Sequence, residues 1–342
     1  MKFFERIKKG IAVRIRWVRI MTSRVVRFIT IDMWRMNADD LEHRRARLLK
    51  DAKVAVLTFN TFSNQKIGFQ ATALSYQSVM SIVPFLAIAF YLTGGLGLSD
   101  KLSAFLYANI SNERLINSLM DAADNILKTA QSGLFGLISM LAFLWIVIWL
   151  MISVRRVFNN VWQVERELKF FRMFGISLGI LILSPFVILL FFSGSIVYTH
   201  VLDLAVPSRV AFSEHIKSFL AWVIYAGAAV MILSAMYKYI PGTKVHYRHA
   251  LKAALIAGPV FMVLQYLYLE TQVMVTRVST VYGVLAALPL FLTYLNLGWT
   301  IVLYGAELSY AYQNVDKYTI EQIERMNAEA VEEKKRKRRE VL

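Results

Sequence analysis

Cysteine is absent from all 342 residues of the chain. The protein therefore has no disulfide bond, no thiolate metal site and no cysteine nucleophile. The phosphate loop GxxxxGK[ST], the zinc-binding helix HExxH and the nucleophile elbow GxSxG are absent as well. The five histidines are scattered, and the apolar stretches offer too few carboxylates for two-metal nuclease chemistry. We expect a non-enzymatic protein without a cofactor or metal.

Charged side chains are missing from six long stretches of the sequence. Residues 67–99, 129–154, 173–202, 218–237, 253–269 and 278–306 contain no Asp, Glu, Lys or Arg. Roughly 20 apolar residues in a helix cross the hydrocarbon core of a bilayer, where the backbone has no partner but itself. With 57% hydrophobic residues and a mean hydropathy of +0.49, the pattern predicts an all-α, polytopic membrane protein with six transmembrane helices.

The charge that is present lies mainly on one side of these predicted spans. Of 39 Lys and Arg residues, 33 lie before residue 68, between residues 155 and 172, between residues 238 and 252, or after residue 307. The three alternate connections hold the other six. Because positive residues concentrate on the cytoplasmic side, we expect both termini in the cytoplasm and a multi-pass protein of a bacterial inner membrane.

The ends of the chain are polar and basic. Residues 1–66 form a predicted basic cytoplasmic or interfacial helical segment, of which residues 1–36 show helical spacing of apolar and basic side chains. Such a helix lies in the headgroup plane or packs on another cytoplasmic segment. Residues 67–312 form the predicted six-helix transmembrane domain, and residues 313–342 a charged cytoplasmic tail. The basic run at 334–339 resembles a nucleic-acid patch, but we favour lipid contact because this whole side is basic.

Three predicted spans each carry a polar stripe at helical spacing. Polar edges are costly in lipid, so we expect them to face the bundle interior or a water-filled cavity; simple contacts between helices are the alternative. The candidate residues for a substrate path are Tyr76, Gln77, Glu270, Arg277, Asn296 and Glu307.

Two further expectations concern charged residues. Arg155 and Arg156 open a predicted cytoplasmic connection, and together with Arg248 they are candidates for binding anionic lipid headgroups. An elbow held by a pair of Arg and Glu is the alternative for the first two. Of the two acids, Glu270 has the longer apolar surround in sequence, so we expect Glu270→Gln to impair function more than Glu307→Gln.

Several of these segments resemble the YihY/BrkB family of bacterial inner-membrane proteins, once assigned as ribonuclease BN. The matching elements are Ala73–Tyr76 with Ser81–Pro84, Arg156–Trp162 with Glu165, Tyr239–Pro241 with Tyr247 and Arg248, Val281–Ala286, and Leu303–Leu308. The resemblance covers about residues 60–312. It implies six membrane helices, no established catalysis, and a link to serum resistance and to export of envelope lipids.

The residues and the resemblance together favour a translocator, or a transport partner, for a phospholipid or another amphiphilic anion of the cell envelope. Its expected partners are membrane lipids with anionic headgroups and an envelope lipid-transfer protein. We expect no nucleic-acid partner, and the sequence is compatible with a homo-oligomer. One alternative is a scaffold that docks envelope-assembly or lipid-transfer proteins. Another is a secondary exporter of a small solute, for which a closed aqueous cavity is expected.

Overall fold

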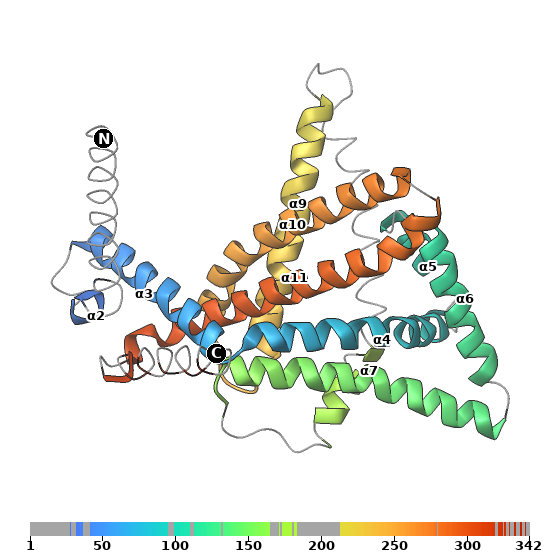
Figure 1. Cartoon of the computed structure of the whole chain (residues 1–342), viewed down its shortest axis with the longest axis horizontal. Helices are drawn as coiled ribbons and strands as arrows, with labels where there is room; N and C mark the ends of the chain where they lie inside the picture. The colour runs from blue at the N-terminus through green and yellow to red at the C-terminus, as the bar shows by residue number, and fades with distance from the viewer. Residues whose placement is uncertain are drawn as a thin grey trace, which may run out of the picture. The chain divides into compact units, whose positions relative to one another are not determined.

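The computed structural model describes most of the predicted membrane domain and a smaller part of the chain ends. The described residues are 28, 32–36, 42–94, 99–109, 113–130, 133–164, 171, 173–179, 181–182, 213–278, 280–318, 321–323, 325, 328, 332, 336 and 339. Within these residues the secondary structure is helical, and no strand occurs. Figure 1 shows the order of the helices.

The helices have the following bounds. They are α2 (Met33–Arg35), α3 (His43–Asn64), α4 (Ile67–Gly94), α5 (Ser99–Asn109), α6 (Glu113–Ala130), α7 (Leu134–Val161), α9 (Ser213–Tyr239), α10 (Tyr247–Val278), α11 (Thr280–Asn314) and the short 3-10 helix η3 (Val315–Lys317).

Five of the described helices are long and apolar enough to cross a membrane. Their candidate spans are Ile67–Thr93, Ile138–Val161, Trp222–Tyr239, Tyr247–Thr271 and Leu288–Lys317. These correspond to five of the six predicted spans. The remaining prediction, 173–202, lies outside the described residues except for 173–179 and 181–182. The predicted amphipathic helix at 1–36 and the basic run at 334–339 also lie almost entirely outside them.

Contacts divide the chain into two compact units, which we describe separately. Unit 1 comprises Met1–Gln65 and Tyr310–Leu342, and unit 2 comprises Lys66–Ser309. In unit 1, α3 packs against α2 and η3, and Lys50 forms an ion pair with Asp316. The hydroxyl groups of Tyr310 and Tyr318 lie 2.9 Å apart.

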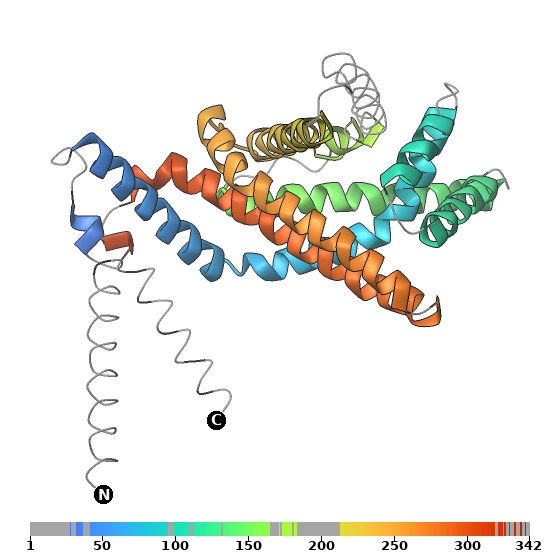
Figure 2. The same ribbon diagram turned by 90° about the horizontal axis from the view of Figure 1, so that it is seen from above.

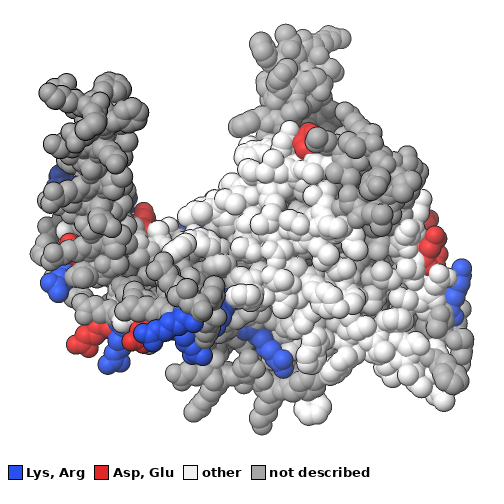
Figure 3. Space-filling view, in the orientation of Figure 1, with Lys and Arg blue, Asp and Glu red and all other residues white. Residues whose placement is uncertain are grey.

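In unit 2, α4 packs along α7 and α9 packs against α10. Figures 1 and 2 show α4 and α7 side by side. The surface of these helices that faces the viewer in Figure 3 is largely without Lys, Arg, Asp or Glu among its coloured atoms. An uncharged surface of this kind is what lipid contact requires.

The connection between the first two spans is folded, which the sequence analysis did not predict. Leu102 of α5 and Ala123 of α6 are buried in one cluster with Leu86, Ala87 and Phe90 of α4. The helix α6 has its apolar residues at helical spacing, with Asp121 and Asp124 exposed. This pattern indicates an amphipathic helix, and α5 and α6 therefore cover the C-terminal half of α4.

Candidate functional site

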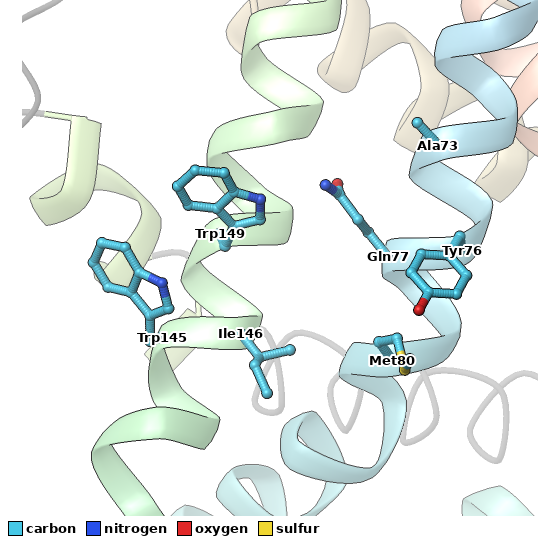
Figure 4. A pocket seen from close by; sticks show the side chains of 7 residues that line it. All are labelled: Ala73, Tyr76, Gln77, Met80, Trp145, Ile146 and Trp149. Atoms are coloured by element: carbon cyan, nitrogen blue, oxygen red, sulfur yellow. The ribbon is translucent and has the colours of Figure 1, made fainter.

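A pocket of about 470 Å³ lies between α4 and α7 (Figure 4). Its lining residues come from two turns of α4 and a little more than one turn of α7: Ala73, Tyr76, Gln77, Met80, Trp145, Ile146 and Trp149. Two of them, Tyr76 and Gln77, were predicted as substrate-path residues. The lining is mostly aromatic and aliphatic, which suits an apolar or amphiphilic ligand better than a small ion.

The Gln77 side chain is the polar element of this lining. Its amide points from α4 toward α7, close to the level of Trp149 (Figure 4). Its Oε1 atom is buried and accepts no hydrogen bond from the described residues. Since a buried carbonyl oxygen without a donor costs about 1–3 kcal/mol, a ligand that supplies an N–H or O–H group would find a ready acceptor here.

A cation lies next to the aromatic part of the pocket. The Trp145 and Trp149 rings are 5.9 Å apart between centroids, and the Arg156 guanidinium lies 5.6 Å from the centroid of Trp149. The geometry is that of a cation–π contact. Both tryptophans are also exposed, at 46% and 40%, so the ring surfaces remain accessible from outside the protein.

The pocket opens away from the neighbouring helix α11. Ser78 of α4 accepts a hydrogen bond of 3.0 Å from Trp299 Nε1 of α11. Met80, which lines the pocket, is two residues further and therefore about 200° around the helix from Ser78. The pocket thus lies on the outer flank of the α4 and α7 pair, and a smaller pocket of about 230 Å³ lies on the Ser78 side.

Residues in the resembling motifs and next to them meet at one end of unit 2. Asn159 of α7, which is 3% exposed, accepts a hydrogen bond of 2.7 Å from the Gly242 N–H. The Phe158 ring lies 6.5 Å from that of Tyr237. Tyr237 in turn packs directly on the backbone of α11 at Gly305. Three segments far apart in sequence therefore join the ends of α7, α9 and α11.

The predicted connection that opens at Arg155 begins as a continuation of α7. The expected cytoplasmic connection from Arg155 is, as far as Val161, the last part of α7. At the end of the helix, the Val164 N–H donates to the backbone carbonyl oxygen of Asn159 at 2.9 Å, and the Gln163 N–H donates to the backbone carbonyl oxygen of Asn160 at 3.0 Å. Gln163 has a positive φ of 51°. These contacts form a Schellman motif, so the arginines are presented on a helix.

The two acids occupy different environments. Glu307 is fully buried, with 0% exposure. Glu270 is exposed on α10 rather than turned into the bundle interior. Glu307 is therefore the acid held away from solvent, and the expectation that Glu270→Gln impairs function more than Glu307→Gln stays a prediction.

The other predicted residues do not share the pocket. Asn296 of α11 donates to Thr72 Oγ1 of α4 at 2.8 Å, which is a contact between helices. Arg155 is half-buried, and Arg248 is exposed in the first turn of α10. The Arg277 side chain lies outside the described part of the structure. Of the five path candidates whose side chains are described, Tyr76 and Gln77 line the larger pocket, and Glu270, Asn296 and Glu307 do not.

Sequence reasoning missed Trp145, Trp149 and Asn159. The signal was present for the tryptophans, because a spacing of four residues puts both on one face of a helix. Asn159 lies in the resembling motif Arg156–Trp162, but its contact was not predictable, because its partner Gly242 is 83 residues away. Among the described residues, no group of three or more His, Asp or Glu side chains could hold a metal ion.

Comparisons with known proteins agree on one family. The model of the family described as Virulence factor BrkB matches residues 58–330. A UPF0761 membrane protein of Aggregatibacter aphrophilus is 26% identical over 280 residues, which are 80% of this chain and 95% of that protein. Another, of Alteromonas mediterranea, is 25% identical and covers 71% of this chain and 82% of its own length.

Other relatives are longer than the region they share with this chain. The aligned region is 58% of a UPF0761 membrane protein of Chromohalobacter salexigens, which is 26% identical over 70% of this chain. No solved structure matches the chain.

Proposed function

The chain belongs to the Virulence factor BrkB family, and we propose that it moves an amphiphilic anion, a phospholipid or a lipid-linked phosphate, between the leaflets of a bacterial inner membrane. The orientation that we propose has both termini in the cytoplasm. It is supported by the 33 basic residues on one side of the spans against six on the other.

The observation that carries this proposal is the pocket on the outer flank of α4 and α7. A lipid that moves across a bilayer has to shelter its polar headgroup while its acyl chains remain in hydrocarbon. A pocket that opens sideways, with aromatic walls and the single buried amide of Gln77, offers both environments at once. Arg156 over Trp149 supplies a positive charge at the rim for a phosphate group.

The same geometry favours a lipid over a small solute as cargo. An exporter of a small polar solute needs an aqueous path enclosed by its helices. The larger pocket instead has exposed walls, with Tyr76 at 59% and Met80 at 53% exposure. Side chains this exposed on a membrane helix face the lipid. A lipid that already lies in the bilayer can therefore enter the pocket directly from the side.

The test is movement of labelled lipid in reconstituted vesicles. Purified protein in vesicles with fluorescent phosphatidylglycerol is expected to accelerate exchange between leaflets, measured as the fraction of label that dithionite bleaches with time. Trp149→Ala is expected to slow the exchange, because it removes a pocket wall and the partner of Arg156. Trp222→Ala, which changes an exposed tryptophan on α9, is the matched control and leaves the rate unchanged.

Substitutions of Arg156 test the part played by charge. A basic side chain near an anionic leaflet contributes about 1 kcal/mol, so Arg156→Gln is expected to weaken lipid binding about fivefold. Arg156→Lys keeps the charge and retains part of the affinity. Exchange by the wild-type protein at the rate of empty vesicles would reject translocation and leave a docking role for the pocket.

A further inference from the structure

The helix α3 has an apolar face that its own unit does not cover. Leu48 and Phe59 are 70% and 66% exposed, and Ala52 and Ala55 between them are exposed as well. Spacings of four, three and four residues bring these four side chains onto one side of the helix. We call this set, Leu48, Ala52, Ala55 and Phe59, the α3 stripe.

The opposite side of α3 already has its packing partners. Leu49, Val54 and Leu57 are buried, with exposures of 9%, 1% and 0%, and α3 packs against α2 and η3 within unit 1. Burial of apolar surface releases roughly 25 cal/mol per Å². Because the α3 stripe is exposed, it contributes little of this free energy to unit 1. Its large side chains remain available to pack on another apolar surface.

Positive charge surrounds the N-terminal half of the stripe. The helix α3 contains Arg44, Arg45, Arg47, Lys50 and Lys53 against one acid, Asp51. The three arginines are exposed. Arg44 and Arg45 lie within about 60° of Leu48 around the helix, so they flank the stripe. Cations beside an exposed apolar stripe are the composition that anionic membrane surfaces attract.

The chain connection places α3 at a membrane surface. The helix ends at Asn64, the turn Gln65 and Lys66 follows, and α4 begins at Ile67, the first residue of a candidate span. The three residue steps from Asn64 to Ile67 reach at most about 11 Å. The C-terminal end of α3, with Phe59 one turn before it, is therefore close to the headgroups where α4 enters the bilayer.

We propose that α3 is an interfacial helix whose stripe enters the anionic leaflet from which α4 starts. Phe59 and Leu48 lie among the upper acyl chains, and Arg44 and Arg45 contact lipid phosphates. Residues 1–66 were predicted as a cytoplasmic or interfacial segment from their basic sequence, and the exposed stripe locates this role on α3 in particular, while residues 1–36 lie almost entirely outside the described residues. The inference is independent of the proposed lipid movement, because it concerns how the chain is anchored and not what it carries.

The absence of cysteine allows a direct test on the full-length protein. Single cysteines replace Leu48, Ala52, Ala55 or Phe59, each labelled with a nitroxide in nanodiscs that contain phosphatidylglycerol. The collision of each label with molecular oxygen, which concentrates in hydrocarbon, and with a water-soluble nickel chelate is measured. Glu321→Cys, at an exposed position of unit 1, is the aqueous reference. Leu141→Cys, exposed on the membrane helix α7, is the lipid reference.

The proposal predicts that all four labels lose nickel collisions and gain oxygen collisions relative to the aqueous reference, approaching the lipid reference. Replacing Arg44 and Arg45 with glutamine is expected to reverse part of this shift at Leu48→Cys. Nickel collisions equal to those of the aqueous reference would overturn the proposal. Protection from both reagents at once would also overturn it, because a second copy or another protein segment would then cover the stripe.

Discussion

Gly305 provides the sharpest test of how the membrane helices pack. A Cβ atom at this position would lie 2.7 Å from Tyr237 Cζ and 2.9 Å from the Cβ of Ala257, with the Tyr237 hydroxyl oxygen closer still. Tyr237 is itself fully buried, so its ring has no free space to enter. Gly305→Ala therefore forces α11 away from α9 and α10.

The expected cost follows from two opposing contributions. Adding a methyl group to a filled core costs about 1–3 kcal/mol. Replacing glycine by alanine inside a helix recovers about 0.5–1 kcal/mol of backbone free energy. We expect a net loss of roughly 1–2 kcal/mol in the free energy of unfolding, because the steric cost exceeds the gain in helix propensity.

The measurement is unfolding of the full chain in mixed micelles with increasing SDS, followed by tryptophan fluorescence. Gly298→Ala is the matched control in α11, since its Cβ meets Phe261 only at 3.4 Å, and it is expected to be neutral or stabilising. Tyr237→Phe removes the nearest clashing atom and is expected to restore part of the stability of Gly305→Ala. Equal stability of Gly305→Ala and Gly298→Ala would refute the packing described for α9 and α11.

Three further predictions concern single contacts. Asn159→Ala leaves the Gly242 N–H without its acceptor and is expected to lower the free energy of unfolding by about 1–3 kcal/mol. Asn296→Val removes the contact with Thr72, and the same assay is expected to show only about 0.6 kcal/mol, a usual value between membrane helices. Burial lowers the pKa of Lys53, although Asp316 opposes this shift. The unfolded chain therefore keeps the Lys53 proton to a higher pH than the folded chain does. Thermal stability is expected to rise with pH from the lowered pKa of the folded state up to 10.5, the ordinary value. Lys53→Met is expected to remove this rise.

Each of these predictions has a contradicting result. Asn160→Ala, at an exposed position next to Asn159, controls for the loss of an asparagine, and equal effects of the two substitutions would contradict the first. A loss for Asn296→Val as large as that for Asn159→Ala would contradict the second. An unchanged pH profile in Lys53→Met would contradict the third, because the rise would then come from another group.

The membrane helices were predictable because the evidence for them is local. A stretch such as 278–306 without charge predicts a span whatever packs beside it, since the solvent is lipid, and α11 occupies it. The family was likewise readable from short motifs such as Leu303–Leu308. Part of the site was predictable too, because Tyr76 and Gln77 stand out as polar residues in an apolar stretch.

The direction of each polar side chain was decided only by the tertiary structure. Helical spacing shows which residues share a face, but not which neighbouring helix covers that face. Glu307 is buried and Glu270 exposed for this reason. The pocket also needs Trp149 from a second helix, and the stripe on α3 is recognisable only because the other side of that helix is filled. Burial depends on the partners that folding brings together, and a single chain segment does not contain them.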